Sequence, residues 1–158
     1  MVYPNEDQEI PVRQIIYAMQ FKGQAGPGDD SGKILAKTAS DSCRITSAVT
    51  GAGLEGKLER AEGGRATFES TVTITGDTSF LESGSIHFGG GNSLRFSTVG
   101  QGYLGGSADP NLKHGTVNWR VDGGEGQFEG ASGLITSNFT LGANGEVVDY
   151  HFGVIFAK

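Results

Sequence analysis

Hydrophobic and polar residues alternate along most of the chain, the pattern of β-strands with one buried face. In GTVNWRVDG (115–123), Val117, Trp119 and Val121 share one face and polar residues share the other. The same alternation occurs in segments 14–22, 65–76, 92–100, 134–141 and 147–156, and more weakly in 32–38, 42–50 and 83–88. Helical spacing is nearly absent, and only 54–62 fits a short helix. The pattern therefore predicts eight or nine strands.

The number of strands indicates how the sheet is arranged. An open sheet of this size leaves two unpaired edges that promote aggregation, so we expect it to close or curl. The sequence predicts an all-β fold, a single antiparallel closed β-barrel of about eight strands, calycin-like in architecture. A β-sandwich is the alternative. No repeat or linker divides the chain, so we expect one domain over residues 1–158, with residues 1–12 as an extended N-terminal arm.

Glycine is unusually frequent, with 27 residues among 158, and it is concentrated in GGEGQFEGASG (123–133). A glycine-rich loop that binds phosphate needs a helix N-terminus directly after it. The residues that follow, LITSNFTL (134–141), alternate and are rich in β-branched types, which predicts a strand. We interpret these glycines as a hairpin turn with left-handed backbone positions and close chain approaches. GAGLEG (51–56) matches a dinucleotide-binding motif by letter but lacks the crossover helix that follows it.

Charge and cysteine content exclude several classes of function. The formal net charge is −6, and nucleic acid requires a basic face, so we expect no nucleic-acid partner. Cys43 is the one cysteine, and we interpret it as a small packed side chain. The acidic, proline-containing N-terminus does not resemble a signal peptide, and no apolar run reaches the ~20 residues of a membrane span. We therefore expect a cytoplasmic protein with no membrane partner.

The C-terminal part of the sequence resembles two families of β-barrel proteins, the allene oxide cyclases and the dirigent proteins. The pattern GG-x-G-x-F-x-x-A-x-G is followed by a strand, a short GANGE turn and an alternating last strand. The matching residues are Gly123, Gly124, Gly126, Phe128, Ala131, Gly133, Gly145, Val147, Val148 and Tyr150. The resemblance implies an eight-stranded antiparallel barrel that assembles as a homo-oligomer, either a trimer or a dimer.

The sequence lacks familiar catalytic and metal-binding spacings. GASG (130–133) does not have the spacing of a nucleophile elbow. His87, His114 and His151 form no paired metal motif, so we expect neither a metal nor a cofactor. His151 alternates with the aromatic residues of segment 147–156, which predicts that it points outward.

The aromatic faces of the predicted strands are the candidate ligand site, because small-molecule sites are mostly apolar with a few polar groups. We expect the site to be lined by Met19, Phe21, Phe96, Tyr103, Trp119, Ser137, Phe139 and Phe152. Tyr103 lies in segment 101–115, which we expect to cover one barrel mouth. The alternative is that the aromatic residues only fill the core and line no ligand site. If the faces are reversed, the lining becomes Arg95, Asn118, Arg120 and Asn138, because a shift of one residue exchanges the faces.

The aromatic faces and the resemblance together suggest a function. We expect a cofactor-independent cyclase, isomerase or lyase that binds a small, largely apolar, oxygenated metabolite inside the barrel. The candidate catalytic residues are Tyr17, Tyr150 and Arg95, as hydrogen-bond donors or weak acids. The alternative is a non-catalytic, lipocalin-like protein that binds a small hydrophobic ligand. A strongly shifted pKa in the cavity favours the enzyme.

Overall fold

The structure is a computed structural model that describes residues 11–30 and 32–158. Within these residues the chain forms nine strands and one short 3-10 helix. They are β1 (Arg13–Pro27), β2 (Lys33–Thr50), β3 (Gly53–Ile74), β4 (Ser79–His87), β5 (Ser93–Thr98), β6 (Gly102–Gly106), β7 (Leu112–Glu125), η1 (Gly126–Phe128), β8 (Ser132–Gly142) and β9 (Glu146–Ala157). Among the described residues, no helix has the length and apolarity needed to cross a membrane.

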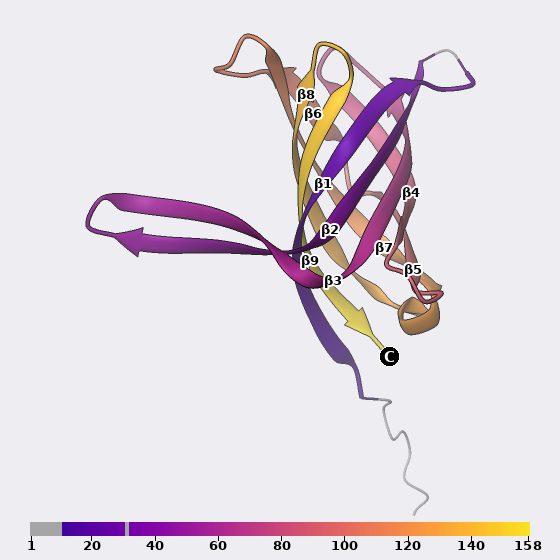
Figure 1. Cartoon of the computed structure of the whole chain (residues 1–158). Coiled ribbons are helices and arrows are strands. Elements are labelled where there is room, and N and C mark those ends of the chain that lie inside the picture. The colour runs from indigo at the N-terminus through magenta and orange to yellow at the C-terminus, as the bar shows by residue number, and fades with distance from the viewer. Residues whose placement is uncertain (1–10, 31) are drawn as a thin grey trace, which may run out of the picture.

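The strands close into a ring. Neighbours pair in the order β3-β2-β1-β9-β8-β7-β5-β4, and β3 also pairs with β4, which closes the sheet. The short strands β5 and β6 share one position, because both lie between β4 and β7. The described chain is therefore an antiparallel barrel with eight strand positions (Figure 1). The predicted fold class is confirmed, and closure of the sheet excludes a sandwich of two open sheets.

Alternate residues of each strand point into the barrel and build its core. On β7, for example, Val117, Trp119 and Val121 are buried while their neighbours are exposed, as the alternation predicts. The rings of Phe96 and Trp119 stack with centroids 4.2 Å apart, and Phe68 lies 5.4 Å from Phe96. Aromatic rings from β3, β5 and β7 therefore meet in the middle of the barrel.

Strands β2 and β3 continue beyond the barrel as a hairpin. Pairing with β1 ends at Ala39, and pairing with β4 begins at Thr67. Residues 43–60 pair only with each other, from Cys43↔Arg60 to Thr50↔Gly53. Figure 1 shows this segment, in purple and magenta, leaving the barrel wall and pointing away from it. We call residues 43–60 the projecting hairpin. The segment 54–62, which fitted a helix by its sequence, lies in β3 instead because its residues pair across this hairpin.

The glycine-rich segment 123–133 forms the turn from β7 to β8, with η1 in its middle. A strand follows it, so the segment lacks the helix N-terminus that a phosphate loop needs. Gly126 has a φ of +64°, and a side chain there would collide with Asn92. The Gln127 N–H donates to Asn92 Oδ1 at 2.9 Å, which ties this turn to the β4–β5 loop. The glycines are therefore needed for a tight turn against a neighbouring loop.

Two segments contain more regular structure than their sequences indicate. Segment 101–115 includes β6 and the start of β7, so only residues 107–111 connect these strands. The first strand continues to Pro27, well into the glycine-containing stretch 23–32. The N-terminal arm predicted for residues 1–12 falls mostly on residues 1–10, which lie outside the described residues.

Candidate functional site

The barrel is hollow at the end where β1, β3 and β8 finish. A wide mouth of about 860 Å³ lies there, bordered by the loops after β1, β6 and β8. A smaller cavity of about 70 Å³ lies directly beneath it, and the two share Ala25, Ile34, Ile74 and Leu141 in their linings. The mouth is the larger hollow, but the smaller cavity contains the buried acidic groups. We therefore place the candidate site in the cavity, with the mouth as its entrance.

Two carboxyl groups reach this cavity, whose other walls are mostly apolar. Glu82 comes from β4 and Asp149 from β9, and both are buried. The strands β4 and β9 lie opposite each other in the ring, four positions apart in either direction. The remaining lining is almost entirely apolar and includes Phe68, Phe80 and Phe139. An apolar cavity with two convergent acidic groups has the composition of a small-molecule site.

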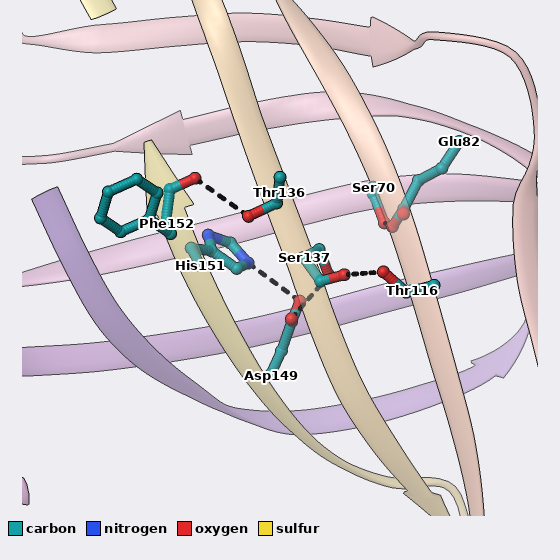
Figure 2. A network of polar contacts seen from close by, with 8 residues as sticks. All are labelled: Ser70, Glu82, Thr116, Thr136, Ser137, Asp149, His151 and Phe152. Atoms are coloured by element: carbon teal, nitrogen blue, oxygen red, sulfur yellow. Dashed lines mark hydrogen bonds and ion pairs between the residues drawn. The ribbon is translucent and has the colours of Figure 1, made fainter. Parts of the chain in front are cut away.

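The environment of Glu82 favours its neutral form. Burial raises the pKa of the carboxyl group to about 7, and the negative charge of Asp149 contributes to the rise. Ser70 opposes it, because its hydroxyl donates to Glu82 Oε2 at 2.6 Å (Figure 2). The Trp119 indole N–H also favours the charged form slightly, although it makes no hydrogen bond to any described residue. Glu82 is consequently able to hold a proton near neutral pH.

The backbone around Glu82 is fixed by one side chain. The Glu82 N–H donates to Thr98 Oγ1 at 2.6 Å, and the Thr98 hydroxyl donates to the Glu82 carbonyl oxygen at 2.7 Å. Thr98 is the last residue of β5, where the wall passes from β5 to β6. The hydroxyl therefore replaces backbone pairing at this break and holds Glu82 in position.

Asp149 belongs to a second polar group on the opposite wall. The Ser137 hydroxyl donates to Asp149 Oδ1 at 2.6 Å, and His151 Nε2 lies 2.9 Å from Asp149 Oδ2 (Figure 2). A hydrogen bond to a carboxylate places the imidazole proton on Nε2. The imidazole stacks on Phe21 with centroids 4.3 Å apart and meets the edge of Trp119. His151 is thereby fixed against the aromatic core, and it orients Asp149.

Several buried polar atoms have no partner within residues 11–30 and 32–158. They are the hydroxyls of Tyr17 and Thr38, Trp119 Nε1 and His151 Nδ1. Of these four residues, Thr38 lines the cavity beside the two carboxyl groups. Buried polar atoms are nearly always satisfied in folded proteins, so unpaired ones mark places where a ligand or a water completes the bonding. The Thr38 hydroxyl is therefore a candidate ligand contact.

The aromatic core closes the barrel beneath the two carboxyl groups. Phe21, Phe96 and Trp119 are fully or almost fully buried there, and Phe88 packs on Phe128 farther down at 5.3 Å. Tyr17 lies in this lower half, where its ring meets the edge of Phe88 at 5.9 Å. Its neighbour across the sheet is Gly153, where a Cβ would occupy the position of the Tyr17 ring. Residue 153 must therefore be glycine for this packing.

The structure places seven of the predicted ligand and catalytic residues inside the barrel. They are Tyr17, Met19, Phe21, Phe96, Trp119, Ser137 and Phe139. Only Phe139 lines the cavity directly, and Ser137 contacts it through Asp149. Burial, together with the charge of Asp149, raises the pKa of Tyr17 far above its ordinary value. Tyr17 therefore stays protonated at neutral pH and is able to donate a hydrogen bond but not to act as a base.

Four predicted site residues lie outside the barrel: Arg95, Tyr103, Tyr150 and Phe152. Tyr150 is exposed and accepts a hydrogen bond from Gln20 on the outer face, and Phe152 is half exposed. On β9 the inner face is Asp149, His151, Gly153 and Ile155, so the strand is turned the opposite way from the prediction. The physical reason is space, because aromatic residues of other strands already fill the interior and leave no room for the aromatic side chains of β9. The reversed lining of Arg95, Asn118, Arg120 and Asn138 also lies outside.

Sequence reasoning missed the three ionisable groups of the site. Glu82 precedes the predicted segment 83–88 by one residue, so it fell outside the strand. Asp149 and His151 were on the face predicted to point outward. A usable signal was present in the sequence of β9. Asp149 and His151 are polar, stand two positions apart and share one strand face with Gly153. Among the described residues, no group of three or more His, Cys, Asp or Glu side chains is arranged to hold a metal ion.

Comparison with known proteins gives one similarity in structure. No protein-family model matches the sequence, and no curated protein sequence matches it significantly. A solved structure, that of the pterocarpan synthase dirigent protein GePTS1, superposes with a TM-score of 0.50 over 96% of this chain and 89% of that chain. The identity is 11%, so the similarity concerns the fold alone. Together with the closed ring of strands, it shows that the chain has a dirigent-like β-barrel fold.

Proposed function

We propose that the protein is a cofactor-independent isomerase or cyclase that acts on a small, largely apolar, oxygenated metabolite. The observation that carries the proposal is the buried Glu82 carboxyl, whose pKa is raised to about 7 at the floor of an apolar cavity. A proton donor with a pKa near the working pH is what general acid catalysis needs. A purely structural or carrier protein has no need for a second carboxyl group, Asp149, in the same apolar space.

The two carboxyl groups have complementary roles in this mechanism. Protonated Glu82 donates its proton to an oxygen of the bound substrate, which makes an adjacent carbon electron-poor. The substrate then rearranges or closes a ring, and Asp149, oriented by Ser137 and His151, accepts a proton from carbon. One proton is added and one removed, so substrate and product have the same formula. Proton transfer between the two carboxyl groups restores the starting state.

The size of the cavity limits how the substrate binds. A volume of about 70 Å³ holds only a small group, whereas typical ligand pockets occupy about 300–1,000 Å³. The oxygen-bearing end of the substrate therefore enters the cavity, and its apolar body lies in the mouth of about 860 Å³. Ile34, Ile74, Leu112 and Leu141 provide apolar contacts there. Holding both ends in this way fixes the conformation of the substrate before it reacts.

The dirigent-like fold also supports a reaction in this barrel. A solved structure with this fold belongs to a protein named as a pterocarpan synthase dirigent protein. The alternative is a carrier that binds a similar metabolite without changing it, and the predominantly apolar lining of the cavity favours it. The two functions differ in what they require of Glu82, because a carrier binds its ligand without a proton donor.

One experiment tests both functions. Trp119 is the single tryptophan and packs beneath the cavity, so its fluorescence reports binding directly. A panel of apolar compounds that each carry one carbonyl, epoxide or phenol group is screened by quenching of this fluorescence. Compounds that bind are then incubated with the protein, and products of unchanged mass are sought by chromatography and mass spectrometry.

The variant Glu82→Gln separates the two functions, with Glu69→Gln on the outer face of β3 as the matched control. We expect Glu82→Gln to retain quenching and to lose turnover by roughly 10²-fold or more, while the control stays unchanged. Quenching without turnover by the wild-type protein supports the carrier. If no compound of the panel quenches Trp119, the cavity is not a site for this class of ligand.

A further inference from the structure

The projecting hairpin, residues 43–60, is an extended surface with no partner of its own. Every residue from Arg44 to Arg60 is exposed, and its two strands pair only with each other. A two-stranded hairpin is marginally stable in water when nothing packs on it. Extension of the hairpin into solvent is therefore unfavourable unless another surface covers it.

The two faces of the projecting hairpin differ in character. Cross-strand partners lie on the same face, so the pairs Ile45↔Leu58 and Val49↔Leu54 form one apolar face. Val49 is 91% exposed and Leu54 is 75% exposed. The opposite face carries Arg44, Thr46, Ala48, Glu55, Lys57 and Glu59. This division is that of a strand pair with one face packed on another protein surface.

The outer wall of the barrel carries a second exposed apolar surface, which we call the wall patch. It extends over β1, β9 and β8, where Ile16 and Leu134 flank Val154 in the sheet. Ile16 is 62% exposed, Leu134 58% and Phe152 51%. Phe152 and Phe156 come from β9, whose aromatic side chains face outward. A contiguous exposed patch of this kind is unusual on a monomeric protein.

The hairpin of one chain is not placed to cover the wall patch of the same chain. At its base, Cys43, Leu58 and Arg60 share a hollow with Gln20 and Lys22 on the outer side of β1. The apolar face of the hairpin and the outer wall of the barrel therefore both border this hollow. Beyond the hollow, the hairpin points away from its own barrel (Figure 1). Its tip, with Val49 and Leu54, is left free to contact another molecule.

We propose that the apolar face of the projecting hairpin packs on the wall patch of a second copy of this chain. Each copy offers both surfaces, so the complementary partner is always present in solution. Each hairpin strand has about eight residues and spans roughly 25 Å, enough to cross the three strands of the patch. This contact specifies a surface for the homo-oligomer that the family resemblance implies.

The hairpin docks by its face and not by adding a strand to the neighbour's sheet. The barrel is closed, so its described strands leave no open sheet edge of the main ring for pairing. The hairpin edges also lie beside charged residues such as Arg44, Lys57 and Glu59, which discourage edge-to-edge pairing. The Lys57–Glu59 ion pair of 2.6 Å stays on the exposed face after docking.

The first test measures the mass of the assembly by sedimentation velocity. We expect the wild-type protein to sediment as an oligomer and the double variant Val49→Asp/Leu54→Asp to sediment as the 16.5 kDa monomer. The matched control, Thr46→Asp/Ala48→Asp, adds the same charge to the opposite face and should leave the assembly intact. Circular dichroism of each variant verifies that the barrel is folded, since the hairpin lies outside it.

The second test identifies the contact itself. In a Cys43→Ser background, Val49→Cys and Leu134→Cys proteins are treated with a short bis-maleimide, separately and mixed. We expect cross-linked dimers only in the mixture, because the hairpin tip meets the wall patch and not another tip. Cross-linking within the Val49→Cys sample alone overturns the proposal in favour of contact between hairpins. A monomeric wild-type protein also overturns it, and binding of that monomer to phosphatidylcholine vesicles would assign the apolar face to a lipid surface.

Discussion

Glu82 and Asp149 enter the same cavity from opposite strands of the barrel, and each accepts a hydrogen bond from a serine on the adjacent strand. Ser70 lies two residues out of register from Glu82, and Ser137 lies two residues out of register from Asp149. The two carboxyl groups therefore have the same local partner at the same distance of 2.6 Å. What distinguishes them is His151, which contacts Asp149 alone. His151 therefore distinguishes the surroundings of Asp149 from those of Glu82, where burial raises the pKa of the carboxyl group to about 7.

The raised pKa of Glu82 makes stability depend on pH. The carboxyl titrates near 4.5 in the unfolded chain and near 7 in the folded protein. Between these values the folded protein binds more protons, so the free energy of unfolding falls as pH rises from about 4.5 to about 7. The gap between the two pKa values corresponds to roughly 3 kcal/mol. Urea unfolding of the wild-type protein and of Glu82→Gln at pH 4.5 and pH 8 should show the variant gaining about this amount at the higher pH.

Glu69→Gln is the control for this measurement, since Glu69 is exposed on β3. The free energy of unfolding of Glu69→Gln should stay within about 0.5 kcal/mol of the wild-type value at both pH values. Equal stability differences for Glu82→Gln at pH 4.5 and pH 8 would show that Glu82 has an ordinary pKa.

Removing the charge of Asp149 should lower the pKa of Glu82. Burial is the main cause of the raised pKa, and Asp149 is a smaller one, so Asp149→Asn moves the value down without restoring 4.5. The Glu82 carboxyl resonance, followed by carbon-13 NMR against pH, gives the value directly. A pKa that is unchanged in Asp149→Asn would mean that the two carboxyl groups do not interact.

Two leucines on neighbouring strands should differ sharply in their effect on stability. Leu94 on β5 is fully buried, whereas Leu81 on β4 is exposed on the outer wall away from the wall patch. Leu94→Ala should lower the free energy of unfolding by about 2–5 kcal/mol, because it leaves a cavity in the core. Leu81→Ala should change it by about 1 kcal/mol or less. Chemical denaturation measures both, and similar losses would contradict the assigned inner and outer faces.

The contact between Gly153 and Tyr17 makes a separate prediction. A methyl group at position 153 collides with the Tyr17 ring, so Gly153→Ala should lower the free energy of unfolding by about 1–3 kcal/mol. Gly64→Ala places its methyl group in open space and should change stability by about 0.5 kcal/mol or less. Thermal unfolding compares the two. A tolerated Gly153→Ala would show that the Tyr17 ring is free to move aside.

The alternation of residues was sufficient to predict the barrel and most of its interior. On β1, β7 and β8, the predicted inward faces carry Phe21, Trp119 and Ile135, all fully buried. Apart from Ile16 and Leu134, the outer faces of these strands are less hydrophobic than the inner ones, so the alternation favours one orientation. The closed sheet followed from the number of strands and the absence of helical spacing.

The last strand and the site were not predictable in the same way. Both faces of β9 carry apolar residues, so its orientation depends on how much space Phe68, Phe96 and Trp119 leave inside. That volume is a property of the assembled barrel and not of the strand. Glu82 was also not predictable, because an acidic residue in a short strand is expected to be exposed. Only the closure of the strands into a ring places it opposite Asp149. The length of the β2–β3 hairpin was hidden because segment 42–50 alternates only weakly and segment 54–62 fits a short helix.

The buried rings of Phe21, Phe96 and Trp119 fill the barrel beneath the cavity, on the side away from the mouth. Under the proposed function, a substrate that enters past Leu141 leaves by the same path, so its product competes with the next substrate for the mouth. Two different molecules have no room to meet at the carboxyl groups, since only about 70 Å³ is free there. The proposed isomerisation or cyclisation fits this geometry, because one molecule enters and the same atoms leave in a new arrangement.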